Sequence, residues 1–415
     1  MSEICNRSLC TGCMACYNSC RKGAIVIKEN NEGFLSPEID QSACVNCGLC
    51  KKICPANNPI ISNEPKKIFA CWSKNEDIRK SSSSGGAFWE LASSVIKSGG
   101  YVAGCVLDNK LKARHIIVGT LTELEQLKGS KYSQSIIGKI YIEVHKLLLH
   151  GQTVLFSGTP CQIAGLKNYL QKDFDNLITV DLVCHGVPSP LLFEDYKEYI
   201  KKEKGFKRID SIVFRGKKRS WMLYNMQVEG VDSEDCKLSY SGHYLIDPWI
   251  RGFLGDNFLR KSCYNCQYAH IGRVSDFTIA DWWSFKPKDG DYSYIQKGVS
   301  SMTCNTERAV SFLSTIKDSF YLESKSLEDY KATNPSLSSS WKEPESRVLF
   351  WSDYNTSGFS KSLIKKYMNR KTITLTHYIE MRYKNHVLIR LLLKILYKKN
   401  ALLKLFNLDK LQIKF

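Results

Sequence analysis

The N-terminal region contains the stretch Cys10-Thr11-Gly12-Cys13-Met14-Ala15-Cys16-Tyr17-Asn18-Ser19-Cys20, and its Cys spacing recurs once, from Cys44 to Cys54. In both copies two residues separate the first three Cys, and three residues precede the fourth. Thiolates at the first three positions can hold three corners of an iron–sulfur cubane on one tight loop, while the fourth lies on a helical turn beyond it. The repeat therefore predicts two [4Fe–4S] clusters.

In the two-cluster bacterial ferredoxin pattern, the fourth Cys of each run binds the cluster of the other run. The expected ligand sets are Cys10, Cys13, Cys16 and Cys54 for one cluster and Cys44, Cys47, Cys50 and Cys20 for the other. Between the runs, the apolar residues 24–27 and 33–35 flank Asn30-Asn31, which predicts a β-hairpin. Zinc is the alternative metal, but it favours two well-separated Cys pairs in a tetrahedron. Cys5 lies outside both runs and is not expected to be a ligand.

The chain has 415 residues, of which 17 are Cys, and nine of these precede Ala56. Its apolar content of 43% and charged content of 24% are typical of a globular protein with two or three domains. The sequence contains no run of 18 apolar residues and no secretory signal at its N-terminus. It therefore predicts a cytoplasmic protein, in which reduced thiols bind metal rather than form disulfides.

Beyond an expected linker at 63–67, strand patterns alternate with helical ones. The expected strands lie at 69–72, 101–107, 154–157, 178–183, 211–214 and 277–280. This order predicts an α/β arrangement with some irregular β structure. The run Ser81-Ser82-Ser83-Ser84-Gly85-Gly86 precedes an amphipathic segment, so it either cradles a phosphate or caps a surface helix. Neither a G-x-G-x-x-G nor a Walker motif supports a Rossmann or P-loop nucleotide site.

Four further Cys lie in turns of this region. Cys161 and Cys184 each follow a strand candidate, and Cys263 and Cys266 form a C-x-x-C pair. Residues just beyond strand ends line the ligand crevice of α/β sheets, so the four thiols are candidates for a third [4Fe–4S] cluster. Alternatively, the first two are buried inert thiols, and the pair is half of a zinc site or a redox pair. His185 is either a proton donor or a strand-end residue.

Seven short motifs occur in one order along residues 1–310. They are Ser83-Ser84-Gly85-Gly86-Ala87, Gly129-Ser130-Lys131-Tyr132-Ser133-Gln134-Ser135, Gly158-Thr159-Pro160-Cys161-Gln162, Cys184-His185-Gly186-Val187-Pro188, Cys263-x2-Cys266, Asp276-Phe277-Thr278-Ile279-Ala280-Asp281-Trp282-Trp283 and Lys297-Gly298-Val299-Ser300. Together they resemble the family of coenzyme F420 hydrogenase/dehydrogenase β subunits, which also includes the iron–sulfur flavoprotein 7-hydroxymethyl chlorophyll a reductase. One departure is Ala280-Asp281-Trp282-Trp283-Ser284, where the family usually has Gly-Asp-x-Trp-Gly.

The resemblance implies that FAD binds non-covalently and without a Rossmann motif. The residues expected to contact the flavin are Ser84, Gly85, Gly86, Lys131, Tyr132, Gln134, Ser135, Thr159 and Asp281. The resemblance also makes Cys161, Cys184, Cys263 and Cys266 the expected ligands of a cluster close to the FAD. We expect His185 or Lys131 to supply a proton or to orient the acceptor.

Clusters carry single electrons, whereas a flavin can exchange two. The expected function is therefore an oxidoreductase that takes electrons from a ferredoxin or another one-electron donor. It would pass them through the clusters to FAD and on to a small-molecule acceptor, such as a deazaflavin or a glycan precursor. The alternative is a non-catalytic electron-transfer subunit that serves a partner enzyme in surface-polysaccharide biosynthesis. No nucleic-acid partner is expected, because no recognised nucleic-acid module is present.

The C-terminal segment 361–415 contains 14 Lys or Arg but only two acidic residues, so its net charge of +12 makes up most of the chain's +18. Within 386–406, Arg390, Lys394 and Lys398 form a basic stripe on an otherwise apolar helical pattern. Such a helix suits an anionic surface at the inner face of a membrane or a groove on a partner, or it packs on the main body.

We therefore expect an α+β chain of three parts. A two-cluster ferredoxin-like domain spans 1–62, an α/β flavin-binding domain spans 63–340, and a basic amphipathic helical tail spans 341–415.

Overall fold

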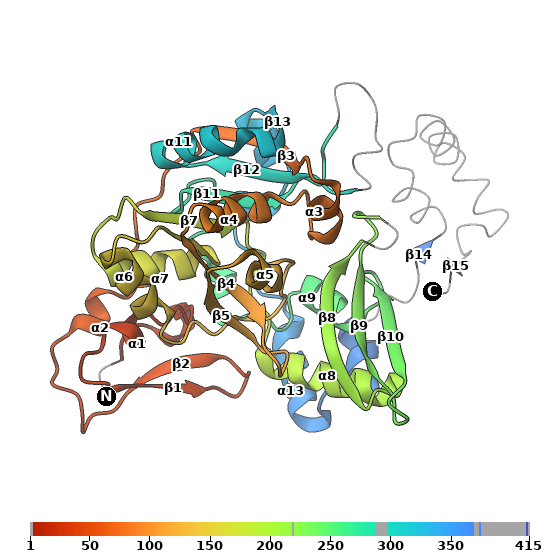
Figure 1. Ribbon diagram of the computed structural model, residues 1–415. Coiled ribbons are helices and arrows are strands. Elements are labelled where there is room, and N and C mark those ends of the chain that lie inside the picture. Colours follow the sequence, from red (N-terminus) through yellow and green to blue (C-terminus); the bar gives the residue numbers. More distant parts are fainter. Residues whose placement is uncertain (1–2, 218–219, 287–296, 369–372, 375–411, 414–415) are drawn as a thin grey trace.

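The computed structural model of the protein describes residues 3–217, 220–286, 297–368, 373–374 and 412–413 (Figure 1). The N-terminal part is a small module of two strands and short helices. A large sheet between helices forms the centre, and a smaller sheet lies beside it (Figure 1). Two strands of the structure have the bounds that the sequence predicted, 101–107 and 154–157. The expected mixed α/β fold is also confirmed.

The N-terminal module contains the expected hairpin. Strands β1 (Ile25–Glu29) and β2 (Leu35–Ile39) pair in antiparallel fashion. The side-chain oxygen of Asn30 closes the turn by accepting hydrogen bonds from the amides of Glu32 and Phe34, at 3.1 and 2.9 Å. The helices of this module are η1 (Arg7–Leu9), α1 (Ala15–Ser19) and α2 (Leu49–Lys52). Gly48 is the N-cap of α2, and its φ of 72° turns the chain out of the second Cys loop.

The central sheet has eight strands in the order β13-β3-β12-β11-β7-β6-β4-β5. Their bounds are β3 (Lys67–Ser73), β4 (Tyr101–Leu107), β5 (Ala113–Val118), β6 (Val154–Ser157), β7 (Leu177–Leu182), β11 (Phe277–Asp281), β12 (Ser300–Cys304) and β13 (Phe320–Ser324). Strands β4, β6, β7 and β11 are parallel neighbours, and the other pairs are antiparallel. The chain therefore leaves β6 and β7 at the same edge of the sheet.

Side chains alternate along these strands, so both faces of the sheet bury apolar residues. One face packs against α4 (Ala87–Lys97) and α11 (Glu307–Ile316). The other face packs against α6 (Ile140–Leu149) and α7 (Pro160–Leu170), and Ala15 of the N-terminal module joins this second core. Shorter helices complete the covering: α3 (Glu76–Ser81), α5 (Leu121–Leu124), η2 (Glu125–Leu127), η4 (Lys317–Ser319), α12 (Leu327–Lys331) and η5 (Pro335–Leu337).

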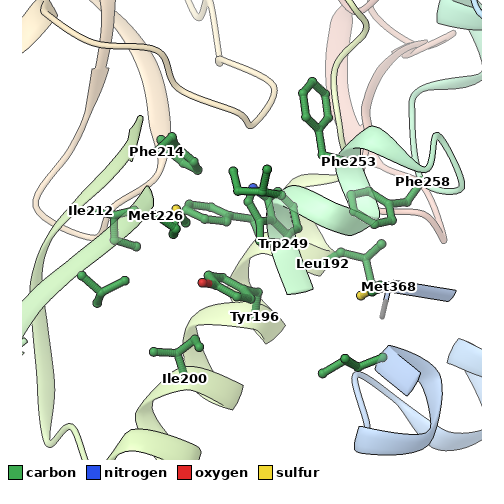
Figure 2. Packing of buried hydrophobic residues seen from close by; sticks show 14 of the residues in the cluster. Leu192, Tyr196, Ile200, Ile212, Phe214, Met226, Trp249, Phe253, Phe258 and Met368 are labelled. Atoms are coloured by element: carbon green, nitrogen blue, oxygen red, sulfur yellow. The ribbon is translucent and has the colours of Figure 1, made fainter. Parts of the chain in front are cut away.

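The smaller sheet has its own core, which Figure 2 shows from close by. Its strands β8 (Arg208–Gly216), β9 (Asn225–Val231) and β10 (Lys237–His243) are antiparallel. The helices packed on it are α8 (Pro190–Lys204), α9 (Pro248–Leu254), α13 (Ser346–Ser357), α14 (Lys361–Leu363) and η6 (Ile364–Met368). Tyr196, Met226, Trp249 and Met368 meet in this core from four different elements (Figure 2).

The segment expected to form a tail begins inside this core. Phe350, Trp351 and Met368 are buried there, so residues 346–368 belong to the packed body. The basic stripe expected at 386–406 lies outside the described residues. Two short strands, β14 (Ile373–Thr374) and β15 (Gln412–Ile413), pair with each other. Within the ranges that the structure covers, no helix combines the length and apolar character that a membrane span requires.

Candidate functional site

The four thiols expected to hold the first cluster lie around one small cavity. Cys10 and Cys13 come from the loop before α1, Cys16 lies within α1, and Cys54 follows α2. The structure thus brings together thiols from both Cys runs, as the crossed ferredoxin pattern requires. Cys5, which lies outside both runs, lines the same cavity.

The second expected set is nearer the surface. Cys47 is exposed, and Cys20, Cys44 and Cys50 are half-buried. Burial raises the pKa of Cys50, and the nearby charges of Cys47 and Cys20 add to this rise. Cys20, Cys47 and Cys50 therefore lie close enough to interact electrostatically. The sulfur of Cys44 accepts a hydrogen bond from the amide of Asn46 at 3.4 Å, and such bonds tune the potentials of iron–sulfur clusters.

The four thiols from the body of the chain converge on a second cavity. Cys161 lies in the first turn of α7 just after β6, and Cys184 follows β7. Cys263 and Cys266 lie in and just after η3 (Lys261–Asn265). All four line the cavity, together with His185. Because β6 and β7 are neighbouring parallel strands, Cys161 and Cys184 meet at one edge of the sheet.

Burial and mutual proximity disfavour the thiolate form of these four side chains. Burial raises the pKa of Cys161 to about 11 and that of Cys263 to about 12. The pKa of Cys184 is raised by burial and also by the charges of the other three thiols. Bound iron reverses this penalty, because a coordinating thiol is deprotonated outright. The donor set is therefore chemically suited to an iron–sulfur cluster.

Hydrogen-bond donors also face these sulfurs. The amide of Val187 donates to the sulfur of Cys263 at 3.5 Å, and Thr159 Oγ1 lies 3.1 Å from the sulfur of Cys161. Among the described residues, no three His, Cys, Asp or Glu side chains converge as the ligands of a single metal ion do. A cubane is larger than one ion and is held at its corners, so its thiols lie farther apart.

The two thiol cavities are neighbours. Thr11 lines both of them. Cys13 packs on α7 at Gly165, where an added Cβ would lie 2.9 Å from Cys13 Cβ and 3.0 Å from its sulfur. Burial raises the pKa of Cys13 to about 12, and the charge of Cys161 contributes to this rise. The helix that carries Cys161 therefore also forms the contact surface for the loop that carries Cys13.

Arg260 connects the two thiol sets directly and is only 4% exposed. Its Nε donates to the carbonyl of Cys10 at 2.7 Å, and its Nη2 donates toward the sulfur of Cys10 at 3.6 Å. Its Nη1 donates to Gln134 Oε1 at 2.9 Å and to the carbonyl of Leu35 at 3.0 Å. The carbonyl of Arg260 in turn accepts from the amide of Cys263 at 2.8 Å.

The Ser-Gly turn before α4 joins two other motifs. Ser83 Oγ accepts a hydrogen bond from the amide of Ser130 at 2.8 Å. Ser84 Oγ donates to the carbonyl of Val299 at 3.0 Å, and the amide of Gly85 donates to Ser300 Oγ at 2.9 Å. Among the described residues, no side chain caps the first amides of α4. Three of the motifs that carry the family resemblance thus meet, and free backbone donors lie at their junction.

Two basic residues at the end of β8 complete this junction. Lys217 Nζ donates to the carbonyls of Arg79, Ser84 and Lys297, at 2.7, 2.5 and 2.8 Å. Burial lowers the pKa of Lys217 to about 7. The buried guanidinium of Arg215 pairs with Asp281 through Nη1, while its Nε and Nη2 make no hydrogen bond within the described residues.

The remaining expected flavin residues have varied contacts. Lys131 Nζ donates to three backbone carbonyls, those of residues 126, 127 and 128, and burial lowers its pKa to about 8. Tyr132 stacks on Phe253 at a centroid distance of 4.7 Å. Gln134 Nε2 donates to the carbonyl of Thr11 at 2.9 Å, so Gln134 faces the N-terminal module. Thr159 and Gln134 line the second thiol cavity, whereas Lys131 is not among the lining residues.

Three basic residues of these sites were not expected from the sequence. The run Arg215-Gly216-Lys217 at the end of a strand pattern carried a usable signal, because basic side chains at strand ends suit anionic ligands. Arg260 carried no such signal, since a single Arg before a Cys pair has no characteristic pattern.

His115 on β5 supports the loop of Ser135. Its Nδ1 lies 2.7 Å from Ser135 Oγ, and its Nε2 lies 3.0 Å from the carbonyl oxygen of Ser157. Burial lowers the pKa of His115 to about 4. The neutral ring therefore stabilises the fold fully above about pH 6.5, and this contribution is lost as the pH falls toward 4. We therefore expect the free energy of unfolding to fall by about 2 kcal/mol when the pH is lowered from 7.5 to 5.

Anaerobic urea unfolding at both pH values measures this effect. The His115→Gln variant should lose less stability than the wild type over this interval, by about 2 kcal/mol. His150→Gln, at an exposed position after α6, is the matched control and should behave as the wild type does. An equal acid response in all three proteins would contradict the assignment to His115.

The thiols of both cavities lie in segments that match known family models. The family model for the C terminus of the coenzyme F420 hydrogenase/dehydrogenase β subunit matches residues 151–330, which contain all four thiols of the second cavity. The 4Fe-4S dicluster domain model matches residues 9–58, which contain both Cys runs. Residues 151–330 are therefore similar to the C-terminal part of coenzyme F420 hydrogenase/dehydrogenase β subunits. This confirms the family resemblance and the N-terminal dicluster domain that the sequence indicated.

Relatives of this family are distant in sequence. A subunit of the F(420)H(2) dehydrogenase of Methanosarcina mazei is 21% identical over 174 residues, which are 39% of this chain and 49% of the relative. The match thus spans about half the length of this relative. An uncharacterized ferredoxin of Methanocaldococcus jannaschii is 35% identical over 66 residues, which are 15% of this chain and 83% of the ferredoxin. A chain of the F420-reducing [NiFe] hydrogenase complex from Methanosarcina barkeri has a TM-score of 0.40 and 12% identity, covering 79% of this chain and 97% of that chain.

Proposed function

We propose that this chain is an iron–sulfur flavoprotein oxidoreductase of the coenzyme F420 hydrogenase/dehydrogenase β-subunit family. It would take electrons from a ferredoxin or another one-electron carrier and deliver them, through [4Fe–4S] clusters and FAD, to a two-electron acceptor. When bound, the clusters supply single-electron transfer, and the flavin supplies the exchange between one- and two-electron chemistry.

The contact between the two thiol cavities carries this proposal. The Cys13 loop packs on the same helix that presents Cys161, and Thr11 lies between the two cavities. Arg260 contacts Cys10 with its side chain and Cys263 with its backbone. A third cluster on Cys161, Cys184, Cys263 and Cys266 would therefore adjoin the first one, so the N-terminal module would have a short electron route into the body.

The junction at the Ser-Gly turn supports FAD as the second cofactor. Free amides at the start of α4 and the spare donors of Arg215 are suited to an anionic group such as a diphosphate. Lys217 holds three segments of this junction through their carbonyls. Its ammonium is used internally, so we assign anion binding to Arg215 and the amides rather than to Lys217.

His185 is the proposed proton donor. Its Nε2 lies 2.6 Å from Asp256 Oδ1, and the rings of Phe253 and Trp341 flank it at centroid distances of 4.7 Å. The carboxylate favours the tautomer that carries its proton on Nε2. Lys131, whose three N–H groups face backbone carbonyls, would hold the 126–131 turn in place.

Anaerobic purification with quantitation of iron, sulfide and flavin tests the proposal. Three cubanes and one flavin correspond to about 12 Fe and one FAD per chain. About 8 Fe would limit the clusters to the N-terminal module. Protein that binds no flavin, even after incubation with FAD, would show that the proposed function is wrong.

Arg215→Lys tests the flavin site. The Lys keeps a charge for Asp281 but lacks the spare Nε and Nη2 donors, so we expect the Kd of FAD to rise by about 30-fold. That factor corresponds to about 2 kcal/mol, the usual worth of a hydrogen bond to a charged group. The measurement is a fluorescence titration of flavin-depleted protein with FAD.

The matched control is Arg208→Lys. Arg208 lies on the same strand as Arg215, but it is exposed and pairs with Asp210 at the surface. The Arg208→Lys variant should bind FAD as the wild type does. If Arg215→Lys also retains the wild-type Kd, the buried guanidinium does not contact the flavin.

A second candidate function is that of a non-catalytic electron-transfer subunit. It is favoured by the Methanosarcina mazei relative, which is named as a subunit of a dehydrogenase. The two candidates differ in one property: an oxidoreductase would reduce small acceptors by itself, whereas a transfer subunit would do so only with its partner enzyme. Turnover of the isolated chain with reduced ferredoxin and deazaflavin or quinone acceptors distinguishes them.

A further inference from the structure

Five thiols, rather than four, line the first cavity. The fifth is Cys5, which lies outside the repeated Cys spacing. We infer that Cys5 is a reserve ligand of the first cluster, able to bind iron in place of either Cys10 or Cys54. The inference rests on the proposed ligand set of Cys10, Cys13, Cys16 and Cys54.

The position of Cys5 determines which two of the four ligands it could replace. Its side chain lines the cavity next to the thiols of Cys10 and Cys54, whose proximity raises the pKa of Cys5. Cys13 instead lies on the side of the cavity that faces α7 and Cys161. A sulfur at Cys5 can therefore replace a sulfur at Cys10 or Cys54 with little movement, but not one at Cys13.

The backbone holds Cys5 in this position from both sides. On one side, Asn57 Nδ2 donates to the carbonyl of Ile4 at 2.9 Å, and the amide of Asn57 donates to the carbonyl of Cys54 at 3.0 Å. On the other side, Asn6 Oδ1 accepts from the amide of Ser8 at 2.9 Å and caps η1, which leads into Cys10. Cys5 is thus tied to the loops of the two ligands that it would replace.

The location also suits a reserve role. Cys5 and Cys10 line a broad surface groove with Arg7 and Lys28, so oxidants reach this side of the first cavity from solvent. Cys13, Cys16 and Cys54 are buried and do not line that groove, so Cys10 is the ligand that solvent reaches there. The exchange itself is not a redox step: the Cys5 thiol releases a proton as its sulfur binds iron, and the thiolate of Cys10 or Cys54 takes up a proton as its own iron bond breaks.

Ligand variants of the anaerobically purified full chain test this inference. Cys54→Ala and Cys10→Ala should each retain the wild-type iron content, whereas the double variants with Cys5→Ala should lose about four Fe. Cys13→Ala should lose about four Fe although Cys5 is present. Cys5→Ala alone should retain full iron, and Cys236→Ala, at an exposed turn, is the control for loss of an unrelated thiol.

The electron paramagnetic resonance spectrum of the reduced protein is the second readout. Retention of the other N-terminal cluster shows that a variant has folded, and exchange of one ligand should shift the signal of the first cluster in Cys54→Ala. Loss of about four Fe from both single variants with Cys5 present would overturn the reserve role but leave the ligand set intact. Full iron in every variant, including Cys13→Ala and the doubles, would instead show that the proposed ligand set is wrong.

Discussion

Replacing Cys161 by Ala is expected to lower the iron content from about 12 to about 8 Fe per chain, with the N-terminal clusters retained. The reason is geometric. Cys161 is one of four thiols around a single cavity, and a cubane that loses one of its corner ligands at a buried site has no other thiolate there. Reduction of bound flavin by dithionite-reduced ferredoxin should then stop, because the only proposed route from the Cys13 loop leads through this cavity.

Iron and sulfide quantitation together with stopped-flow flavin absorbance measures both effects. Cys105→Ala is the matched control, since Cys105 is a half-buried thiol on β4 that lines neither thiol cavity. It should keep full iron and normal flavin reduction. Unchanged iron in Cys161→Ala would exclude this residue as a ligand, and unchanged flavin reduction with about 8 Fe would place the electron route elsewhere.

Replacing Arg260 by Met is expected to lower the free energy of unfolding by about 3 kcal/mol. The substitution leaves the carbonyls of Cys10 and Leu35 and the side chain of Gln134 without their charged donor in a buried place. Unpaired buried acceptors cost much more than exposed ones, because water cannot replace the lost bond. The N-terminal module should therefore separate from the body at lower urea concentration.

Anaerobic urea unfolding, followed by the visible absorbance of the clusters, measures this loss. Arg260→Lys should fall between the wild type and Arg260→Met, because an ammonium cannot reach the guanidinium's acceptors on two sides at once. The neighbouring Lys261→Met is the control: Lys261 is a surface residue paired with Glu343, and its loss should cost less than about 1 kcal/mol. If Arg260→Met is no less stable than Lys261→Met, Arg260 does not hold the module in place.

The candidate site could be predicted only in part from the sequence. The spacing of Cys10 to Cys20 and of Cys44 to Cys54 predicted the dicluster domain, because ligands on one short loop are a local property of the chain. The interpretation of Ser84 to Gly86 as a ligand-contacting turn rested on resemblance. In the structure Gly85 is also required for packing, since a Cβ there would lie 2.5 Å from the carbonyl oxygen of Cys71.

Local pattern therefore determined the ferredoxin repeat, the hairpin at 25–39 and five strands of the central sheet, because each depends on residues a few positions apart. The strands β5, β12 and β13 of the same sheet were not predicted. Only the tertiary structure decided how these thiols meet. Cys161 and Cys184 share a cavity because neighbouring parallel strands end at one sheet edge, and Cys263 reaches the same cavity from η3. Arg260 reaches Cys10, and Cys5 joins the first cavity, only after distant segments have packed together. Such contacts arise from long-range burial and leave no periodic trace in the sequence.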